Sequence, residues 1–220
     1  MTSPLQYALM VGPLAFYLWL LACWNSGRSP RVVSGLVDHA LLVFGVGGVL
    51  AFGPLGQLAA RLIFGKPDGY DWIFILAALG LVSTLLARRS LHRLVVYHVD
   101  AETITRVLEE TLDDMDGRFE WTLGGFEDRA SARGLQVEIG RRLRSALIEA
   151  YGSEPERLIQ EVRSRLREAL RGRKTAASAV AMTLFGSSIA VMVAPLIGLF
   201  LTQPKARAAL RVWLERLRGV

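Results

Sequence analysis

Residues 175–202, TAASAVAMTLFGSSIAVMVAPLIGLFLT, form a run of 28 residues without a charged side chain. They follow residues 88–174, which carry 33 charged side chains, whereas residues 1–87 carry only seven. A lipid bilayer sorts a chain in this way, because charged groups are excluded from hydrocarbon while apolar runs enter it. The pattern predicts a membrane protein in which one charged, water-exposed domain lies between membrane-spanning segments.

The overall composition agrees with this class. Apolar residues make up 52% of the 220 residues and the mean hydropathy is +0.34, both high for a water-soluble protein. A single cysteine, Cys23, excludes an intrachain disulfide and a zinc site built on paired cysteines. The formal net charge of +6 does not predict nucleic-acid binding, because residues 88–174 hold 17 basic and 16 acidic side chains, and the surplus lies beside the apolar segments and in the tail.

Four apolar segments are expected to cross the membrane as helices, because about 20 helical residues span a bilayer core about 30 Å thick. The second is rich in glycine around Pro54, where a kink is expected, and the third is the shortest. The fourth exceeds the length of one crossing and is expected to tilt or bend. Three of the segments lie in a membrane region at residues 1–90, and the four are residues 4–24, 40–60, 72–87 and 175–202.

Four crossings would place residues 25–39 and the charged domain on one side of the membrane, and the loop near Lys66 and the tail on the other. Arg28 and Arg31 follow a first segment that no basic residue precedes, so the positive-inside rule puts the domain in the cytoplasm. The basic tail disagrees with this orientation unless the last segment returns as a re-entrant hairpin. The expected location is the inner membrane of a bacterium.

Two sets of side chains are predicted to contact the surroundings of these segments. Small residues at every fourth position of the last segment predict a close helix interface, within the chain or between copies: Gly186, Ala190, Ala194 and Gly198. The tail, residues 203–220, is predicted to be an amphipathic basic helix. Side chains in the tail and beside the segments are expected to lie at the membrane surface: Arg88, Arg89, Arg93, Arg207, Arg211, Trp213 and Arg218.

Two alternatives for the apolar segments remain open. Residues 20–23, Leu-Leu-Ala-Cys, loosely resemble a lipoprotein cleavage box, although no basic residue precedes the first segment as a signal peptide requires. Phe-Gly is followed by Pro-Leu nine residues after the glycine in both 44–55 and 185–196. Interrupted helices in matching places are typical of transporters with inverted repeats.

Residues 91–172 are predicted to form a water-exposed α+β two-layer sandwich, with one sheet covered on a single face by two helices in the order β-α-β-β-β-α. Gly124-Gly125 is predicted to be a turn, and 144–151 is taken as a strand although its helix propensity is nearly as good. The expected strands are 94–99, 119–123, 135–139 and 144–151, and the expected helices are 101–115, capped by Asp100, and 153–170, which begins with a capping box of Ser153 and Glu156.

No metal or cofactor site is predicted. The aspartates at 113, 114 and 116 resemble a calcium loop, but an EF-hand loop requires acidic residues where Leu112 and Leu123 stand. The three histidines have no spacing suited to metal ligands.

No catalytic residue is predicted either. Glu127, Asp128 and Arg129 form a charged cluster for which a local ion pair is the expected role rather than catalysis. No phosphate-binding glycine loop and no nucleophile elbow occur in the sequence.

The sequence therefore predicts a non-enzymatic multipass membrane protein whose cytoplasmic domain makes protein contacts or self-associates. Its expected partners are the bilayer and either another membrane protein or a second copy. Nucleic acid is not among the expected partners. Two alternatives are a small transporter or channel subunit, suggested by the kinked glycine-bearing segments, and a membrane-bound enzyme that uses carboxylates of the exposed domain.

Overall fold

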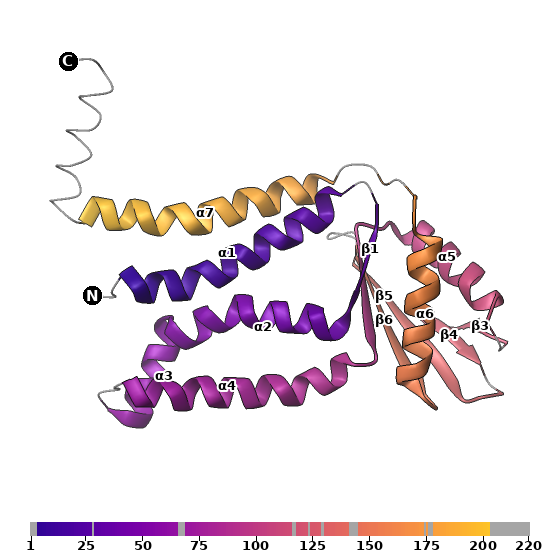
Figure 1. Cartoon of the computed structure of the whole chain (residues 1–220), viewed down its shortest axis with the longest axis horizontal. Helices are drawn as coiled ribbons and strands as arrows, with labels where there is room; N and C mark the ends of the chain where they lie inside the picture. The colour runs from indigo at the N-terminus through magenta and orange to yellow at the C-terminus, as the bar shows by residue number, and fades with distance from the viewer. Residues whose placement is uncertain are drawn as a thin grey trace, which may run out of the picture.

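The computed structural model describes residues 4–27, 29–65, 69–115, 118–122, 124–128, 130–140, 145–173, 175 and 178–202. Long helices lie side by side in one part of the molecule, and an antiparallel sheet with two helices of its own stands across their ends (Figure 1). The chain is therefore mostly helical, with one small sheet domain. The helices of the first part are α1 (Pro4–Ser26), α2 (Gly35–Phe52), α3 (Pro54–Phe64), α4 (Gly69–Ser90) and α7 (Ala179–Thr202).

Three helices in the described part of the chain are long and apolar enough to cross a membrane, judged by length and composition. They lie within α1, α2 and α4, where the sequence predicts the first three crossings. The apolar stretch described in α7, Ala179–Ala194, is shorter by the same measure. The three long stretches are Tyr7–Ser26, Gly35–Phe52 and Asp71–Ser90.

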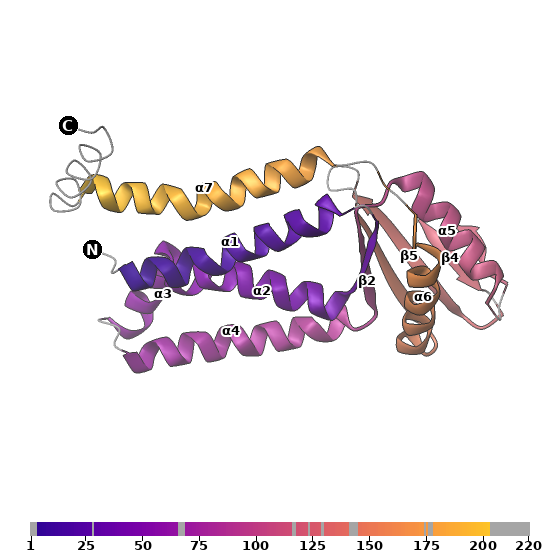
Figure 2. The same cartoon turned by 45° about the horizontal axis from the view of Figure 1, so that its top comes forward.

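These helices are arranged in a row rather than around a common centre. α7 packs on α1, α1 on α2, and α2 on α4, and both views show this order (Figure 2). Gly48 permits the contact between α1 and α2, since an added Cβ would lie 2.5 Å from the Leu9 carbonyl oxygen. The Ser188 hydroxyl donates a hydrogen bond of 2.9 Å to the Ala15 carbonyl and joins α7 to α1.

A row of helices leaves broad apolar faces uncovered. Large side chains point away from the neighbouring helices, with exposed fractions of 78% for Leu62, 76% for Met182 and 67% for Phe74. A monomeric water-soluble protein rarely exposes a contiguous apolar patch of more than a few hundred Å². Within the described part of the chain, the helices therefore do not bury these apolar faces against one another.

The second apolar segment differs from its prediction at its start and at Pro54. Its helix begins at Gly35 rather than at residue 40, because the Ser34 side chain accepts a hydrogen bond from the Val37 amide and caps the first turn. The kink expected at Pro54 is a complete break, since α2 ends at Phe52 and Pro54 starts α3. Proline lacks the N–H that continues a helix but fits a first turn.

The last apolar segment forms one uninterrupted helix that ends far from the sheet (Figure 1). The re-entrant hairpin is therefore wrong for the described part of α7. The alternative of matching interruptions is wrong as well, because the helix breaks before Pro54 but continues through Pro195. The predicted tail helix, residues 203–220, lies outside the described residues.

The sheet has six antiparallel strands in the order β1-β2-β6-β5-β4-β3. α5 (Ala101–Asp113) and α6 (Pro155–Ala169) share its core on one face. The strand expected at 144–151 is confirmed as β6. The strands are β1 (Arg31–Ser34), β2 (Arg93–Tyr97), β3 (Glu120–Thr122), β4 (Gly125–Asp128), β5 (Arg133–Gly140) and β6 (Ser145–Gly152).

Alternating side chains build the core between the sheet and its helices. Leu94 and Val96 of β2 pair with Ile148 and Ala146 of β6, and all four are buried. The Asp100 carboxylate caps α5 by accepting the Thr103 amide at 2.9 Å, as the sequence predicts. The helices contribute one apolar face each: Ile104, Val107, Leu108 and Leu112 from α5, and Leu158, Ile159, Val162 and Leu166 from α6.

Three features of the domain correct the prediction. The loop between the first two segments contains β1, and the charged stretch after Gly124 forms β4, so the sheet has two more strands than expected. The capping box of α6 is wrong, because Glu154 in a left-handed conformation (φ 50°) precedes Pro155 and makes no side-chain cap. The Ser153 hydroxyl instead donates to the Ser131 carbonyl at 2.9 Å.

Candidate functional site

The helical row and the sheet meet at a polar junction built by the end of α1, the start of α2 and strand β2. The Tyr97 hydroxyl donates a hydrogen bond to the Asp38 carboxylate in the first turn of α2. The Trp24 ring of α1 packs 5.2 Å from the Tyr97 ring, measured between centroids. Burial, followed by the negative charge of Asp38, raises the pKa of Tyr97 far above its usual value, so the phenol stays protonated and keeps donating.

Backbone pairing makes this junction short and stiff. Strand β1 enters α2 directly, and its pairing with β2 makes the start of α2 continuous with the sheet. Gly35 lies so close to α4 that an added Cβ would be 2.6 Å from the Ser90 carbonyl oxygen. The His39 Nε2 atom lies 3.1 Å from the Ser83 carbonyl oxygen, a second link between α2 and α4. The sheet domain is thus fixed to the helices at β1, β2 and the start of α2.

Asp38 and His39 lie in a part of the chain whose structure differs from its prediction. The sequence places them in a loop, whereas the structure includes them in the early turns of an apolar helix. Both have polar partners at the junction, which lowers the cost of placing them there.

The predicted membrane-surface residues fall into three groups. Arg88 and Arg89 are exposed in the last turn of α4, beside the junction. Arg93 is instead part of β2, where its Nη2 and Nε atoms lie 2.8 Å and 2.9 Å from the Glu149 carboxylate. The remaining four lie outside the described residues: Arg207, Arg211, Trp213 and Arg218.

The predicted ridge of small residues on α7 is not the surface that contacts α1. Gly186, Ala190 and Ala194 are exposed, and a Cβ added to Gly186 would have no atom within 4 Å. Gly198 continues the ridge by its position in α7. The contact with α1 uses a different side of the helix, where Ser188 is buried. An interface between copies along this ridge stays a prediction.

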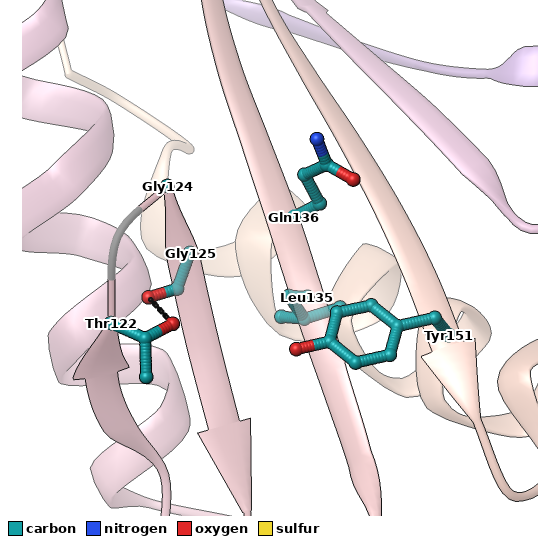
Figure 3. Close-up of a pocket in the computed structure, with 6 residues that line it drawn as sticks. All are labelled: Thr122, Gly124, Gly125, Leu135, Gln136 and Tyr151. Atoms are coloured by element: carbon teal, nitrogen blue, oxygen red, sulfur yellow. Dashed lines mark hydrogen bonds between the residues drawn. The ribbon is translucent and has the colours of Figure 1, made fainter.

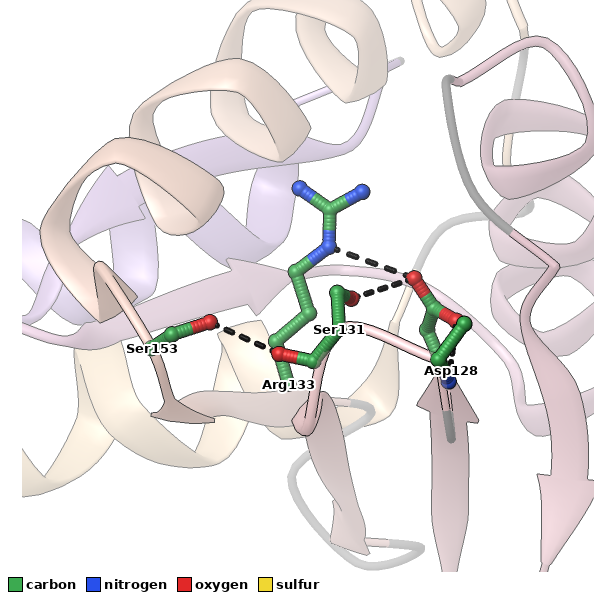
Figure 4. Close-up of polar contacts among 5 residues, drawn as sticks. Asp128, Ser131, Arg133 and Ser153 are labelled. Carbon is green, nitrogen blue, oxygen red and sulfur yellow. Dashed lines mark hydrogen bonds and ion pairs between the residues drawn. The ribbon is translucent and has the colours of Figure 1, made fainter.

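The charged cluster after Gly124 is divided between the two faces of the sheet. Asp128 is buried, and its carboxylate accepts hydrogen bonds from the Ala130 amide at 3.1 Å and from the Ser131 hydroxyl, with Arg133 Nε 3.5 Å away (Figure 4). The Ser131 bond first, and the Ala130 amide and Arg133 next, lower the pKa of Asp128 against the opposing effect of burial. Asp128 therefore stabilises the turn from β4 to β5.

An ion pair at this cluster joins Asp128 to Arg133. The expected cation of the cluster, Arg129, lies outside the described residues. Asp113 and Asp114 are exposed at the end of α5, and Asp116 is not among the described residues. Within the described ranges, no group of three or more His, Cys, Asp and Glu residues is placed to hold a metal ion.

The sheet face opposite α5 and α6 divides into two halves. Next to the junction, Val95 and Tyr97 of β2 are buried. From β6 to β3, outward-facing side chains are exposed or half-buried and no described helix packs over them. We call this second half the acidic face, because it carries the following polar side chains: Glu120, Thr122, Glu127, Gln136, Glu138, Glu149 and Tyr151.

A hollow of about 270 Å³ lies on the acidic face (Figure 3). Gly125 lines the hollow, and a Cβ there would lie 1.9 Å from the Leu135 carbonyl oxygen. A Cβ at Gly134, beside the hollow, would lie 2.4 Å from Cζ of Tyr151. Without side chains there, the Tyr151 ring can lie across β5 with its hydroxyl toward β4. Thr122 and Gln136 line the hollow as well.

Neither the hollow nor the junction was predicted from the sequence. The alternation along 144–151 was a usable signal, because it puts Glu149 and Tyr151 on the face opposite the core. The contact between Asp38 and Tyr97 had no such signal, since it joins residues 59 positions apart.

The fold and these surfaces define a class: a mostly helical chain with three helices apolar enough to span a membrane, joined to a small antiparallel sheet domain. No known protein family, curated protein or solved structure matches the chain. Its function is therefore argued from its own geometry.

Proposed function

We propose that this chain is an integral protein of the inner membrane, with α1, α2, α4 and α7 crossing the bilayer, and that its cytoplasmic α+β domain acts by binding another protein rather than by catalysis. The observation that carries the membrane placement is the row of helices whose apolar side chains point outward. A second copy or a bilayer would be needed to cover them, and a bilayer covers both sides of a row at once.

The size of the solvation effect supports this placement. Moving one large apolar side chain fully out of water is worth about 1.5–3 kcal/mol. About ten such side chains in the row, even half-exposed, amount to roughly 10 kcal/mol, which is comparable with the whole stability of a domain. Three that show the effect are Leu62, Phe74 and Met182.

The direction of the helices and the positions of basic side chains support a cytoplasmic location for the sheet domain. α1 ends and α2 begins at the sheet, while α3 and the end of α7 lie at the opposite end of the row (Figure 1). Exposed basic side chains lie at the sheet end: Arg31, Arg88 and Arg89. Because basic residues are enriched on the cytoplasmic side, this arrangement favours a cytoplasmic domain.

Contact with another protein is favoured over catalysis and over transport. The one carboxylate of the charged cluster that is buried, Asp128, is engaged in a turn. The transport alternative depended on matched interruptions, and α7 is uninterrupted at Pro195. What the domain offers instead is a large uncovered sheet face held in a fixed orientation by the junction.

Membrane placement can be tested with two cysteine variants of a Cys23→Ala chain. Ser164→Cys puts a thiol on the exposed side of α6, and Phe64→Cys puts one at the end of α3. In spheroplasts, a membrane-impermeant maleimide should label residue 64 at once and residue 164 only after permeabilisation. Extraction with alkaline carbonate should leave the chain in the pellet. Release by carbonate, or equal labelling of both thiols before permeabilisation, would refute the placement.

A further inference from the structure

The acidic face has a charge pattern that the described residues of the chain do not balance. Glu149 is paired with Arg93, but no described cation pairs with Glu120, Glu127 or Glu138. Glu120 and Glu127 stand directly opposite each other in the register of β3 and β4. Like charges in directly opposite positions destabilise a sheet, so this arrangement favours the approach of positive charge from outside.

The hollow adds a feature that selects the shape of the positive group. Its volume of about 270 Å³ is below the range of about 300–1,000 Å³ typical of sites for drug-sized ligands, but it can admit one long side chain. The Tyr151 ring forms part of the wall, and an aromatic face attracts a guanidinium or ammonium group. The side-chain oxygens of Gln136 and Thr122 are acceptors available to such a group.

We propose that the acidic face binds a basic, membrane-proximal segment of another membrane protein, with one Arg or Lys side chain in the hollow beside Tyr151. The inference rests on the proposed function and names the chemistry of the partner. Two observations favour a membrane-proximal segment as the source of this basic side chain. The acidic face belongs to the same side of the sheet as Tyr97, which contacts the helix ends. In addition, the cytoplasmic segments next to membrane spans are rich in Lys and Arg.

Charge argues against other partners. Anionic lipid headgroups and nucleic-acid phosphates would be repelled by unpaired glutamates. A second copy of this chain is the remaining occupant, and the experiment below separates it from a partner protein.

The experiment measures binding of a fluorescent oligo-arginine peptide to the full chain in nanodiscs of zwitterionic phosphatidylcholine, by fluorescence anisotropy. The same peptide with glutamine in place of arginine is the peptide control. Tyr151→Leu should weaken binding about threefold, because it removes the aromatic face but no charge. The pair Glu127→Gln and Glu138→Gln should weaken it about tenfold.

A matched variant removes the same number of charges elsewhere. Glu109 on α5 and Glu168 on α6 are exposed on the helices that cover the opposite face, so Glu109→Gln with Glu168→Gln should change binding less than twofold. Equal weakening by both pairs would show attraction to net charge alone and would overturn the inference. Absence of saturable binding would also overturn it.

Two further measurements, of dimerisation and of membrane insertion, separate the possible results. If the chain dimerises in nanodiscs and the Glu127 and Glu138 variants dissociate the dimer, the face is an interface between copies and the inference is wrong. Membrane insertion of each variant is checked separately, by the cysteine labelling in spheroplasts described above. A correctly inserted chain that fails to bind the peptide refutes this inference alone, whereas a chain that does not insert refutes the proposed function.

Discussion

The sheet face opposite α5 and α6 is covered by the ends of the helices in one half and is uncovered in the other. Beside the helices, Val95 and Tyr97 are buried by the junction. From β6 outward, the same side of the sheet is mostly polar, with glutamates, a glutamine and an exposed tyrosine, although Leu147 of β6 lies opposite Val95. The change from apolar to acidic residues coincides with the point where cover from the chain ends. The residue composition of each half therefore agrees with whether another part of the chain covers it.

The largest effect is expected from placing a charge in the covered half. Val95→Asp would bury an unpaired carboxylate under the helix ends, which costs about 3 kcal/mol or more. Gln136→Asp makes the matched change in the uncovered half, where water solvates the charge, and should cost about 1 kcal/mol or less because Glu149 lies directly opposite. Urea unfolding of the detergent-solubilised chain measures both. Equal losses of stability would mean that the two halves do not differ in cover.

The second effect comes from removing one hydroxyl in each half. Tyr97→Phe leaves the Asp38 carboxylate without its donor and should cost about 1–3 kcal/mol. Tyr151→Phe removes a hydroxyl on the exposed side of β6 and should change stability by a few tenths of a kcal/mol. The same unfolding assay compares the two variants. A Tyr97→Phe chain as stable as the unsubstituted protein would contradict the proposed role of the junction.

The third effect is the pH dependence that Asp128, on the core side of the sheet, gives to the stability of the fold. The pKa of Asp128 is lowered in the folded chain, so its stabilising effect is present above its unfolded pKa of about 4 and is lost as the pH falls through the lower folded value. Asp128→Asn should therefore lower the unfolding midpoint at neutral pH, and the difference should shrink below about pH 4. Thermal unfolding across this range checks the sign, and a constant difference would contradict it.

The smallest effect is expected on the acidic face itself. Glu127→Gln removes the repulsion with Glu120 and should raise stability by a few tenths of a kcal/mol at low salt. Added salt screens the same repulsion and should reduce the gain. Measurement at two ionic strengths distinguishes this from a packing effect, which salt would leave unchanged.

The local elements were predictable where periodicity and caps act over a few residues. The helix after Asp100 and the strand at 144–151 were found in this way, because burial on one face imposes a period of 3.6 or 2 residues. Strand β1 was missed, since its four residues are defined by pairing with β2 some 60 positions later. The break at Gly53 was underestimated as a kink for a related reason: where a helix resumes depends on its tertiary neighbours.

The candidate surfaces were less predictable than the fold. The hollow requires two glycines and a tyrosine on three different strands to come together, and the sequence carries only the strand pattern. The small residues of α7 share one ridge of the helix by their spacing alone, but which side of α7 meets α1 depends on Ser188 and Ala15. No pattern within α7 specifies that pair.

The central claim is that the helical row lies in lipid and the sheet domain in water, and two native tryptophans test it directly. Trp19 of α1 and Trp121 of β3 are similarly exposed, at 46% and 53%. Two variants, each retaining one of these tryptophans with phenylalanine at all other tryptophan positions, are reconstituted into vesicles that contain brominated lipids. Bromine should quench the fluorescence of Trp19 and leave that of Trp121 unchanged. Equal quenching of the two, or none of Trp19, would contradict the account.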